Sequence, residues 1–152
     1  MINMMFNWLF AENFAEVGIS WFDFYSIGHI CFGIGAFTIL SLFYTIPKKR
    51  GKTPLISLLF VFILSFLLFI GWELLENILF IEIGWKFEGR IDSWANIIID
   101  IIMGIVGGLG CWGFCYWIFE KEGHIWEYYL FGICGFGLWL GVFMIMRAYY
   151  NI

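Results

Sequence analysis

The stretch Gly71-Trp72-Glu73-Leu74-Leu75-Glu76-Asn77 places two carboxylates at the end of a long apolar run. Residues 54–70 before it carry no charge, and a second apolar run, residues 97–119, has Asp100 as its only charged residue. Ionisable side chains in such segments are costly and usually functional. On helices, residues 73, 76 and 77 share one face, and residues 92, 96 and 100 form a stripe at i, i+4 and i+8. The sequence therefore predicts that two polar helix faces meet.

Composition places the chain among polytopic membrane proteins. The 152 residues are 62% hydrophobic and 13% charged, whereas a soluble domain is about half apolar and about one quarter charged. The four cysteines all lie in apolar runs, which argues against a secreted disulfide framework. We predict an all-α fold, an integral membrane four-helix bundle with a short N-terminal interfacial helix. Membrane lipid is the expected partner, nucleic acid is not, and a homo-oligomer is left open.

Four apolar runs are each long enough for a bilayer core, which needs about 20 residues. The predicted spans are residues 21–46, 54–80, 93–119 and 124–146, within a transmembrane domain over 21–152. Residues 1–20 place apolar and polar side chains at helical spacing, which predicts an amphipathic segment lying on the membrane. Glycines in the spans, including Gly104-x-x-x-Gly108 and Gly137-x-x-x-Gly141, predict close helix contacts.

The distribution of cations predicts the orientation. Five lie in the first and third loops, and three lie on the opposite side: Lys48, Lys49, Arg50, Lys52 and Lys121 against Lys86, Arg90 and Arg147. Because cytoplasmic loops carry the excess of Lys and Arg, both termini are expected outside, in a prokaryotic cell membrane. The acids then converge in the outer half, and the inner half is expected to be almost purely apolar.

Five carboxylates are predicted to crowd this outer region, and they must be neutralised in a low dielectric. They are Asp23, Glu73, Glu76, Asp92 and Asp100. A divalent cation, shared protons or purely structural bonds would each do so, and the sequence leaves the three open. For a cation, we expect Mg, Mn or Zn with ligands His29, Glu73, Glu76 and Asp100. Asp92 or Glu76 would transfer the proton, and further polar contacts would come from Asn77, Asn96, Arg90 and Arg147.

These motifs resemble a known family. Gly71-Trp72-Glu73-x-x-Glu76-Asn77, then Arg90, then Asp92-Ser93-x-x-Asn96-x-x-x-Asp100 is similar to the motif block of an uncharacterised bacterial family of four-span membrane proteins. Gly28-His29-Ile30-x-x-Gly33 resembles the histidine–glycine segment of that family. The order of His, Glu and Asp/Asn across spans is more distantly similar to VanZ-like proteins, in which Asp precedes Asn. The resemblance implies a compact four-helix membrane domain and supplies no activity.

Three functions fit such a site. The leading hypothesis is a metal-dependent enzyme acting on a lipid-linked or headgroup substrate at the outer leaflet. The alternatives are a small ion- or proton-coupled carrier or channel subunit, and a non-catalytic scaffold subunit. A polar region confined to one half favours a substrate that enters and leaves from one face, because alternating access needs polar surface on both sides of the midplane. Whether the protein is an enzyme stays open at this point.

Overall fold

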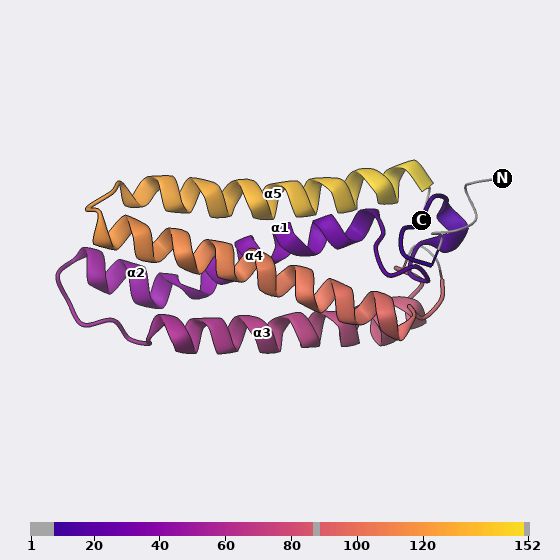
Figure 1. The fold of residues 1–152 in the computed structure, drawn as a ribbon, viewed down its shortest axis with the longest axis horizontal. Coiled ribbons are helices and arrows are strands. Elements are labelled where there is room, and N and C mark those ends of the chain that lie inside the picture. The colour runs from indigo at the N-terminus through magenta and orange to yellow at the C-terminus, as the bar shows by residue number, and fades with distance from the viewer. Residues whose placement is uncertain (1–7, 87–88, 151–152) are drawn as a thin grey trace.

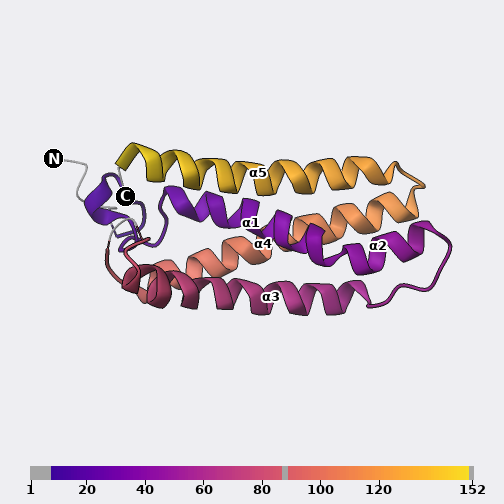
Figure 2. The same cartoon turned by 180° about the vertical axis from the view of Figure 1, so that it is seen from behind.

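A computed structural model of the protein describes residues 8–86 and 89–150, without the side chains of 146, 147, 149 and 150. The described chain is helical, as predicted, and its helices run side by side (Figures 1 and 2). In order they are α1 Phe24–Leu40, α2 Leu42–Lys49, α3 Leu58–Leu74, the π-helical turn η2 Leu75–Phe80, α4 Trp94–Glu120 and α5 Ile125–Tyr150. Three helical runs are long and apolar enough to cross a membrane, or four if α1 and α2 form one bent span.

The first predicted span is interrupted at Ser41. The axes of α1 and α2 differ by 48°, and the Ser41 hydroxyl donates to the carbonyl oxygen of Thr38 at 2.8 Å, competing with the helical backbone bonds. Further along, Pro47 lies inside α2 and removes the N–H that would bond the Phe43 carbonyl. The N–H of Leu55 bonds that carbonyl instead, at 3.1 Å. The carbonyl that Pro47 leaves free therefore ties the α2–α3 connection to α2.

The N-terminal segment, residues 8–23, covers one end of the helices (Figure 1). Over residues 8–20 it is a folded loop with a single 3₁₀ turn, Phe14–Glu16, where the sequence predicted a continuous surface helix. Backbone bonds join it to the start of α1, from Trp21 to Trp8 and from Phe22 to Leu9. Phe10, one of the apolar residues that suggested a helix face, stacks on Phe22 instead. Residues 1–7 of the predicted segment lie outside the described residues.

Helix α1 is central and packs against α3, α4 and α5. Two glycines allow its backbone to approach that of α4 closely. A Cβ at Gly33 would lie 2.1 Å from the Gly104 carbonyl oxygen, and one at Gly107 would lie 2.1 Å from that of Ile30. In contrast, a Cβ at Gly137 or Gly141 would meet nothing within 4 Å in the described chain. Only the first of the two predicted glycine motifs therefore lies at a contact.

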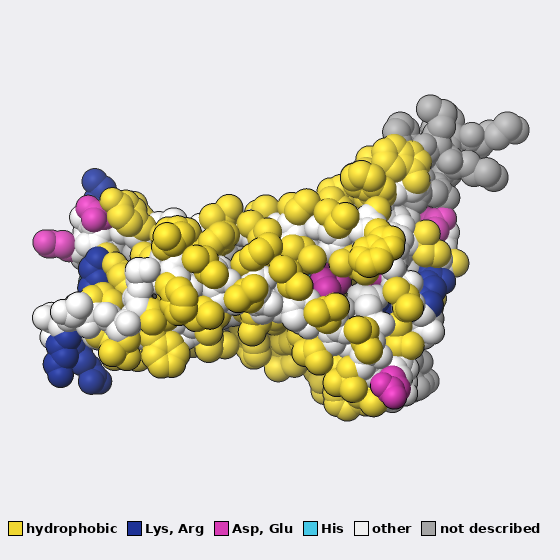
Figure 3. Space-filling model, turned by 90° about the horizontal axis from the view of Figure 1, so that it is seen from below, with side chains coloured by type: hydrophobic (Ala, Val, Ile, Leu, Met, Phe, Trp, Pro, Cys, Tyr) yellow, Lys and Arg dark blue, Asp and Glu magenta, His cyan; other side chains and the backbone are white. Residues whose placement is uncertain are grey.

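The ends and sides of the molecule differ in polarity. Segment 8–23, residues 81–86 and 89–93, and the end of α5 lie together, and the α2–α3 and α4–α5 connections lie at the opposite end (Figures 1 and 2). Apolar side chains cover the length between them, and Lys and Arg side chains gather at the ends (Figure 3). This is the distribution that a membrane-spanning protein requires.

The half of the molecule that contains α2 is not purely apolar, which corrects the sequence-based expectation. Ser41 and Tyr128 share a hydrogen bond of 2.7 Å, and Thr45 and Tyr129 share one of 2.8 Å. Thr38 is also buried and lies 3.1 Å from the thiol of Cys111. These polar groups are uncharged and partnered, so they join α1 to α4 and α5 without a buried charge.

Candidate metal centre

Three ionisable side chains from three helices meet near the end covered by segment 8–23. His29 of α1 lies between Glu73 of α3 and Asp100 of α4. Its Nδ1 is 3.5 Å from Glu73 Oε1, and its Nε2 is 3.6 Å from Asp100 Oδ2. The three residues are only 7%, 4% and 4% exposed. The predicted convergence of these residues is therefore present.

Both carboxylates keep an oxygen that forms no hydrogen bond within the described chain. These atoms are Glu73 Oε1 and Asp100 Oδ1. The other Glu73 oxygen accepts from the amide of Asn77 at 3.4 Å. Buried polar atoms nearly always have partners, so two carboxylates with an unbonded oxygen each, on either side of one imidazole, indicate a place for a ligand.

The spacing of these atoms suits a small cation. One ligand atom from each of His29, Glu73 and Asp100 lies within 4.8 Å of the other two. Ligand atoms about 2.0–2.2 Å from a tetrahedral zinc ion lie about 3.3–3.6 Å apart, and each carboxylate contact of His29 has this length, one at each ring nitrogen. An imidazole binds an ion through one nitrogen, and the second nitrogen of a metal ligand usually faces a carboxylate or carbonyl. Either ring nitrogen of His29 meets that condition.

Glu76 was predicted as a fourth ligand, but it lies outside this three-residue group. Its carboxylate accepts a hydrogen bond of 2.9 Å from the indole N–H of Trp72. The π-helical turn that begins at Leu75 changes the direction of the following side chains relative to a regular helix. The sequence pattern assumes a regular helix and does not reveal this turn.

Lys86 is the site residue that the sequence interpretation missed. It is 5% exposed, forms an ion pair with Asp92, and donates to Asn77 Oδ1 at 2.9 Å. The same amide oxygen accepts the backbone N–H of Asp92 at 2.8 Å. Burial raises the pKa of the Asp92 carboxyl, while the charge of Lys86 acts in the opposite direction. Asp92, one of the two residues expected to transfer a proton, is thus engaged in a buried ion pair.

Segment 8–23 is fixed over the site by polar contacts. Asp23 caps α1 and accepts from the Gly18 N–H at 2.9 Å. Asn96 donates to Asp23 at 3.2 Å and to the Ser20 carbonyl at 3.2 Å. Arg90 donates to the carbonyls of residues 15 and 17 at 2.8 and 2.6 Å. Arg90, predicted as a further polar contact of the site, therefore holds this segment in place. The side chain of Arg147 lies outside the described part of the chain.

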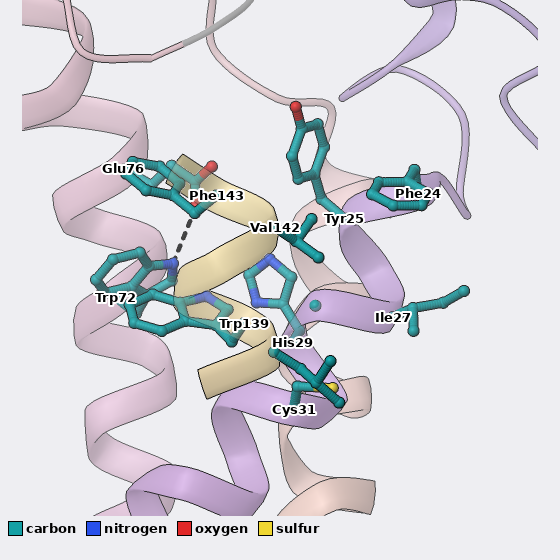
Figure 4. Close-up of a pocket in the computed structure, with 12 residues that line it drawn as sticks. Phe24, Tyr25, Ile27, His29, Cys31, Trp72, Glu76, Trp139, Val142 and Phe143 are labelled. Carbon is teal, nitrogen blue, oxygen red and sulfur yellow. Dashed lines mark hydrogen bonds between the residues drawn. The ribbon is translucent and has the colours of Figure 1, made fainter. Parts of the chain in front are cut away.

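Two cavities of unequal size adjoin the site. The one beneath segment 8–23 measures about 10 Å³ and is lined by Gly18, Asp92 and Asn96 among others. The other, which we call the side cavity, measures about 190 Å³. It is lined by residues of α1 between 24 and 31, by Trp72 and Glu76, and by residues of α5 between 138 and 143. His29 and Glu76 line both. Figure 4 shows the His29 imidazole within the side cavity, among Trp72, Trp139 and Val142.

An aromatic layer separates the site from the hydroxyl-containing half. Phe32 is buried against Phe69, with ring centroids 5.9 Å apart. It also packs on Trp72 and Trp139, at 5.0 and 5.1 Å. The described polar side chains therefore form two zones with aromatic rings between them.

No family model, curated protein or solved structure matches this chain. The resemblance to the uncharacterised four-span family and to VanZ-like proteins therefore stays a prediction.

Proposed function

We propose that the protein is a four-span membrane bundle whose His29, Glu73 and Asp100 bind a divalent cation. The observation that carries the proposal is the meeting of these three buried side chains with one unbonded oxygen on each carboxylate. A mixed nitrogen and carboxylate ligand set suits Zn²⁺ or Mn²⁺ better than Mg²⁺, which prefers oxygen alone. In this arrangement α1 and α2 together make the first span.

The bound cation would serve a metal-dependent enzyme whose substrate is a membrane lipid or a lipid-linked molecule. A metal in such a site supplies an activated water or polarises a bond of the substrate. The aromatic layer of Phe32, Phe69, Trp72 and Trp139 supports an enzyme over a carrier, because it blocks a continuous polar route through the described helices. Glu76 lines both the small cavity beneath segment 8–23 and the side cavity, as Tyr25 does, and its carboxylate would transfer a proton to or from a substrate held there.

Metal analysis of the purified protein tests this proposal. Wild-type protein should contain about one divalent ion per chain, and Asp100→Asn and Glu73→Gln should each retain less than about one tenth of it. Both changes keep the size of the side chain and remove the charge. Glu120→Gln, an exposed acid on the same helix as Asp100, is the matched control and should keep the ion. Metal-free wild-type protein would overturn the proposal.

Turnover separates the three functional classes. Metal-loaded protein in detergent, incubated with a bacterial total lipid extract, should form a product detectable by mass spectrometry. Chelation should stop the reaction, one divalent ion should restore it, and Asp100→Asn should lower the rate by at least about a hundredfold. Ion transport into liposomes without lipid turnover would instead indicate a carrier. If neither is found and Asp100→Asn leaves cellular function intact, the scaffold alternative stands.

We also propose that the metal centre faces the outer leaflet. The positive-inside rule supports this orientation, because the α2–α3 connection holds four cations within residues 48–52. A cysteine at Glu82 should react with a membrane-impermeant maleimide in intact cells, and a cysteine at Lys49 should react only after lysis. Both positions are exposed, so a reversed labelling pattern would place the site at the inner leaflet.

A further inference from the structure

The side cavity, lined mainly by α1 and α5 with Trp72 and Glu76, has the size of a ligand site. Its volume is about 190 Å³, which exceeds the roughly 150 Å³ of an engineered apolar cavity that binds benzene. Helices α3 and α5 both pack against α1 and α4, and Trp72 and Trp139 bridge the space between them with ring centroids 5.1 Å apart. Leu138 and Val142 of α5 add apolar side chains to the wall of the cavity.

The cavity opens sideways, on the surface that faces the membrane interior. Two of its lining residues, Ile27 of α1 and Leu138 of α5, are apolar and 63% and 60% exposed. The helices that form it are apolar enough to lie in the hydrocarbon region. Lipid tails, which are the solvent at this depth, are therefore what the opening meets.

The inner end of the cavity is polar, and its base is closed. His29 and Glu76 are the titratable side chains that line the cavity apart from Tyr25 and Cys31, and His29 belongs to the metal centre. The cluster of Phe32, Trp72 and Trp139 closes the base. A molecule with an apolar chain and a polar group fits this arrangement if the polar group lies toward His29 and Glu76.

Access from the aqueous end is much narrower. The cavity beneath segment 8–23 is about 10 Å³, which is close to the roughly 10–15 Å³ that a single water needs. The Ser93 N–H and hydroxyl both bond this segment, at Gly18 and Ile19, and hold it over the opening. A substrate larger than water therefore meets less obstruction from the membrane side.

We propose that the side cavity binds one hydrocarbon chain of a membrane phospholipid, which enters past Ile27 of α1 and Leu138 of α5 and places its polar group beside His29 and Glu76. Chain binding depends only on the cavity, whereas the reaction of that lipid at the metal centre rests on the proposed function. The substrate class is then a lipid that is cleaved or modified close to its chain, since the metal centre adjoins the inner end of the cavity.

Photolabelling tests chain binding directly. The protein is placed in nanodiscs of phosphatidylethanolamine and phosphatidylglycerol, with a trace of phosphatidylglycerol that carries a diazirine in one acyl chain. After illumination, peptides that contain residues 24–31 and 138–143 should be labelled preferentially. Gly28→Leu should lower this labelling about tenfold, because the added side chain displaces about two methylene groups from the cavity. A Cβ at Gly28 would lie 3.8 Å from Trp139, so the first atom of the new side chain fits.

Gly71→Leu is the matched control, because a Cβ there would meet nothing within 4 Å, and it should leave the labelling unchanged. Val142→Phe, which fills the cavity from α5, provides a second test if Gly28→Leu fails to fold, with the exposed Leu140→Phe as its control. Equal labelling of wild type and both folded cavity variants would overturn the proposal. The proposal would also be overturned if the wild type carries no lipid label in the cavity and forms a homodimer that the cavity variants lose. A second copy of the chain would then occupy the cavity.

Metal content, measured on the same samples, separates the two proposals. Cavity variants that lose the lipid label and keep the ion support the chain site and leave the metal centre intact. Wild-type protein that is labelled in the cavity but contains no ion would overturn the proposed function and leave the chain site standing. Wild-type protein that contains the ion but is labelled evenly along its apolar surface would overturn the chain site and leave the proposed function standing.

Discussion

Replacing Gly33 or Gly107 with alanine should prevent the helices from packing. In each case the new Cβ would lie 2.1 Å from a backbone carbonyl oxygen of the facing helix, and a backbone atom cannot move aside as a side chain can. The α1 and α4 backbones would have to separate along the surface that also positions His29 and Asp100. We expect a loss of at least about 3 kcal/mol of folding free energy, measured by chemical unfolding in mixed micelles. Loss of the monodisperse peak in size-exclusion chromatography would also show that the variant does not pack correctly.

Gly110→Ala on the same helix is the matched control. A Cβ there would meet nothing within 4 Å, and alanine favours a helix over glycine by about 1 kcal/mol. This variant should therefore be as stable as the wild type or slightly more stable. If Gly33→Ala and Gly110→Ala unfold alike, the α1 and α4 backbones are not in direct contact at Gly33 and Gly107.

The fold class and the residues that meet at the site follow from the free-energy cost of placing polar and charged groups in a membrane. Long apolar runs leave few alternatives to membrane-spanning helices, and Glu73 and Asp100 attract attention because charge is expensive within such runs. Helical spacing then brings them to facing surfaces, and His29 from α1 completes the group. The fold class and this group of three residues can therefore be predicted from the sequence.

Other features depend on local backbone geometry that the sequence pattern does not reveal. The π-helical turn at Leu75–Phe80 separates Glu76 from the three-residue group. The bend at Ser41 divides the first span, and the contacts of Trp8 and Phe10 with Trp21 and Phe22 replace a surface helix with a loop. The hydroxyls of Thr38, Ser41 and Thr45 were overlooked because uncharged polar residues hardly alter the hydrophobic pattern.

Lys86 is the clearest example, because its position in a connection between helices suggests a solvated side chain. It is instead buried, and removing its charge should be among the most damaging single changes outside the helices. Lys86→Met would leave Asp92 as an uncompensated buried carboxylate and remove a donor from Asn77. Breaking a buried ion pair in this way costs about 3–5 kcal/mol, which the same unfolding measurement should detect. Lys49→Met, at an exposed position, should change stability by less than about 0.5 kcal/mol.

A double-mutant cycle distinguishes a specific pair from a general effect of the mutation. Asp92→Asn alone should also be destabilising, because it leaves the Lys86 ammonium buried without its counter-charge. The double variant Lys86→Met with Asp92→Asn removes both charges, so its loss should fall short of the sum of the single losses by about 1–3 kcal/mol. Additive losses would show that Lys86 and Asp92 do not stabilise each other. If Lys86→Met unfolds like Lys49→Met, the Lys86 side chain is solvated in the folded protein and does not form a buried ion pair with Asp92.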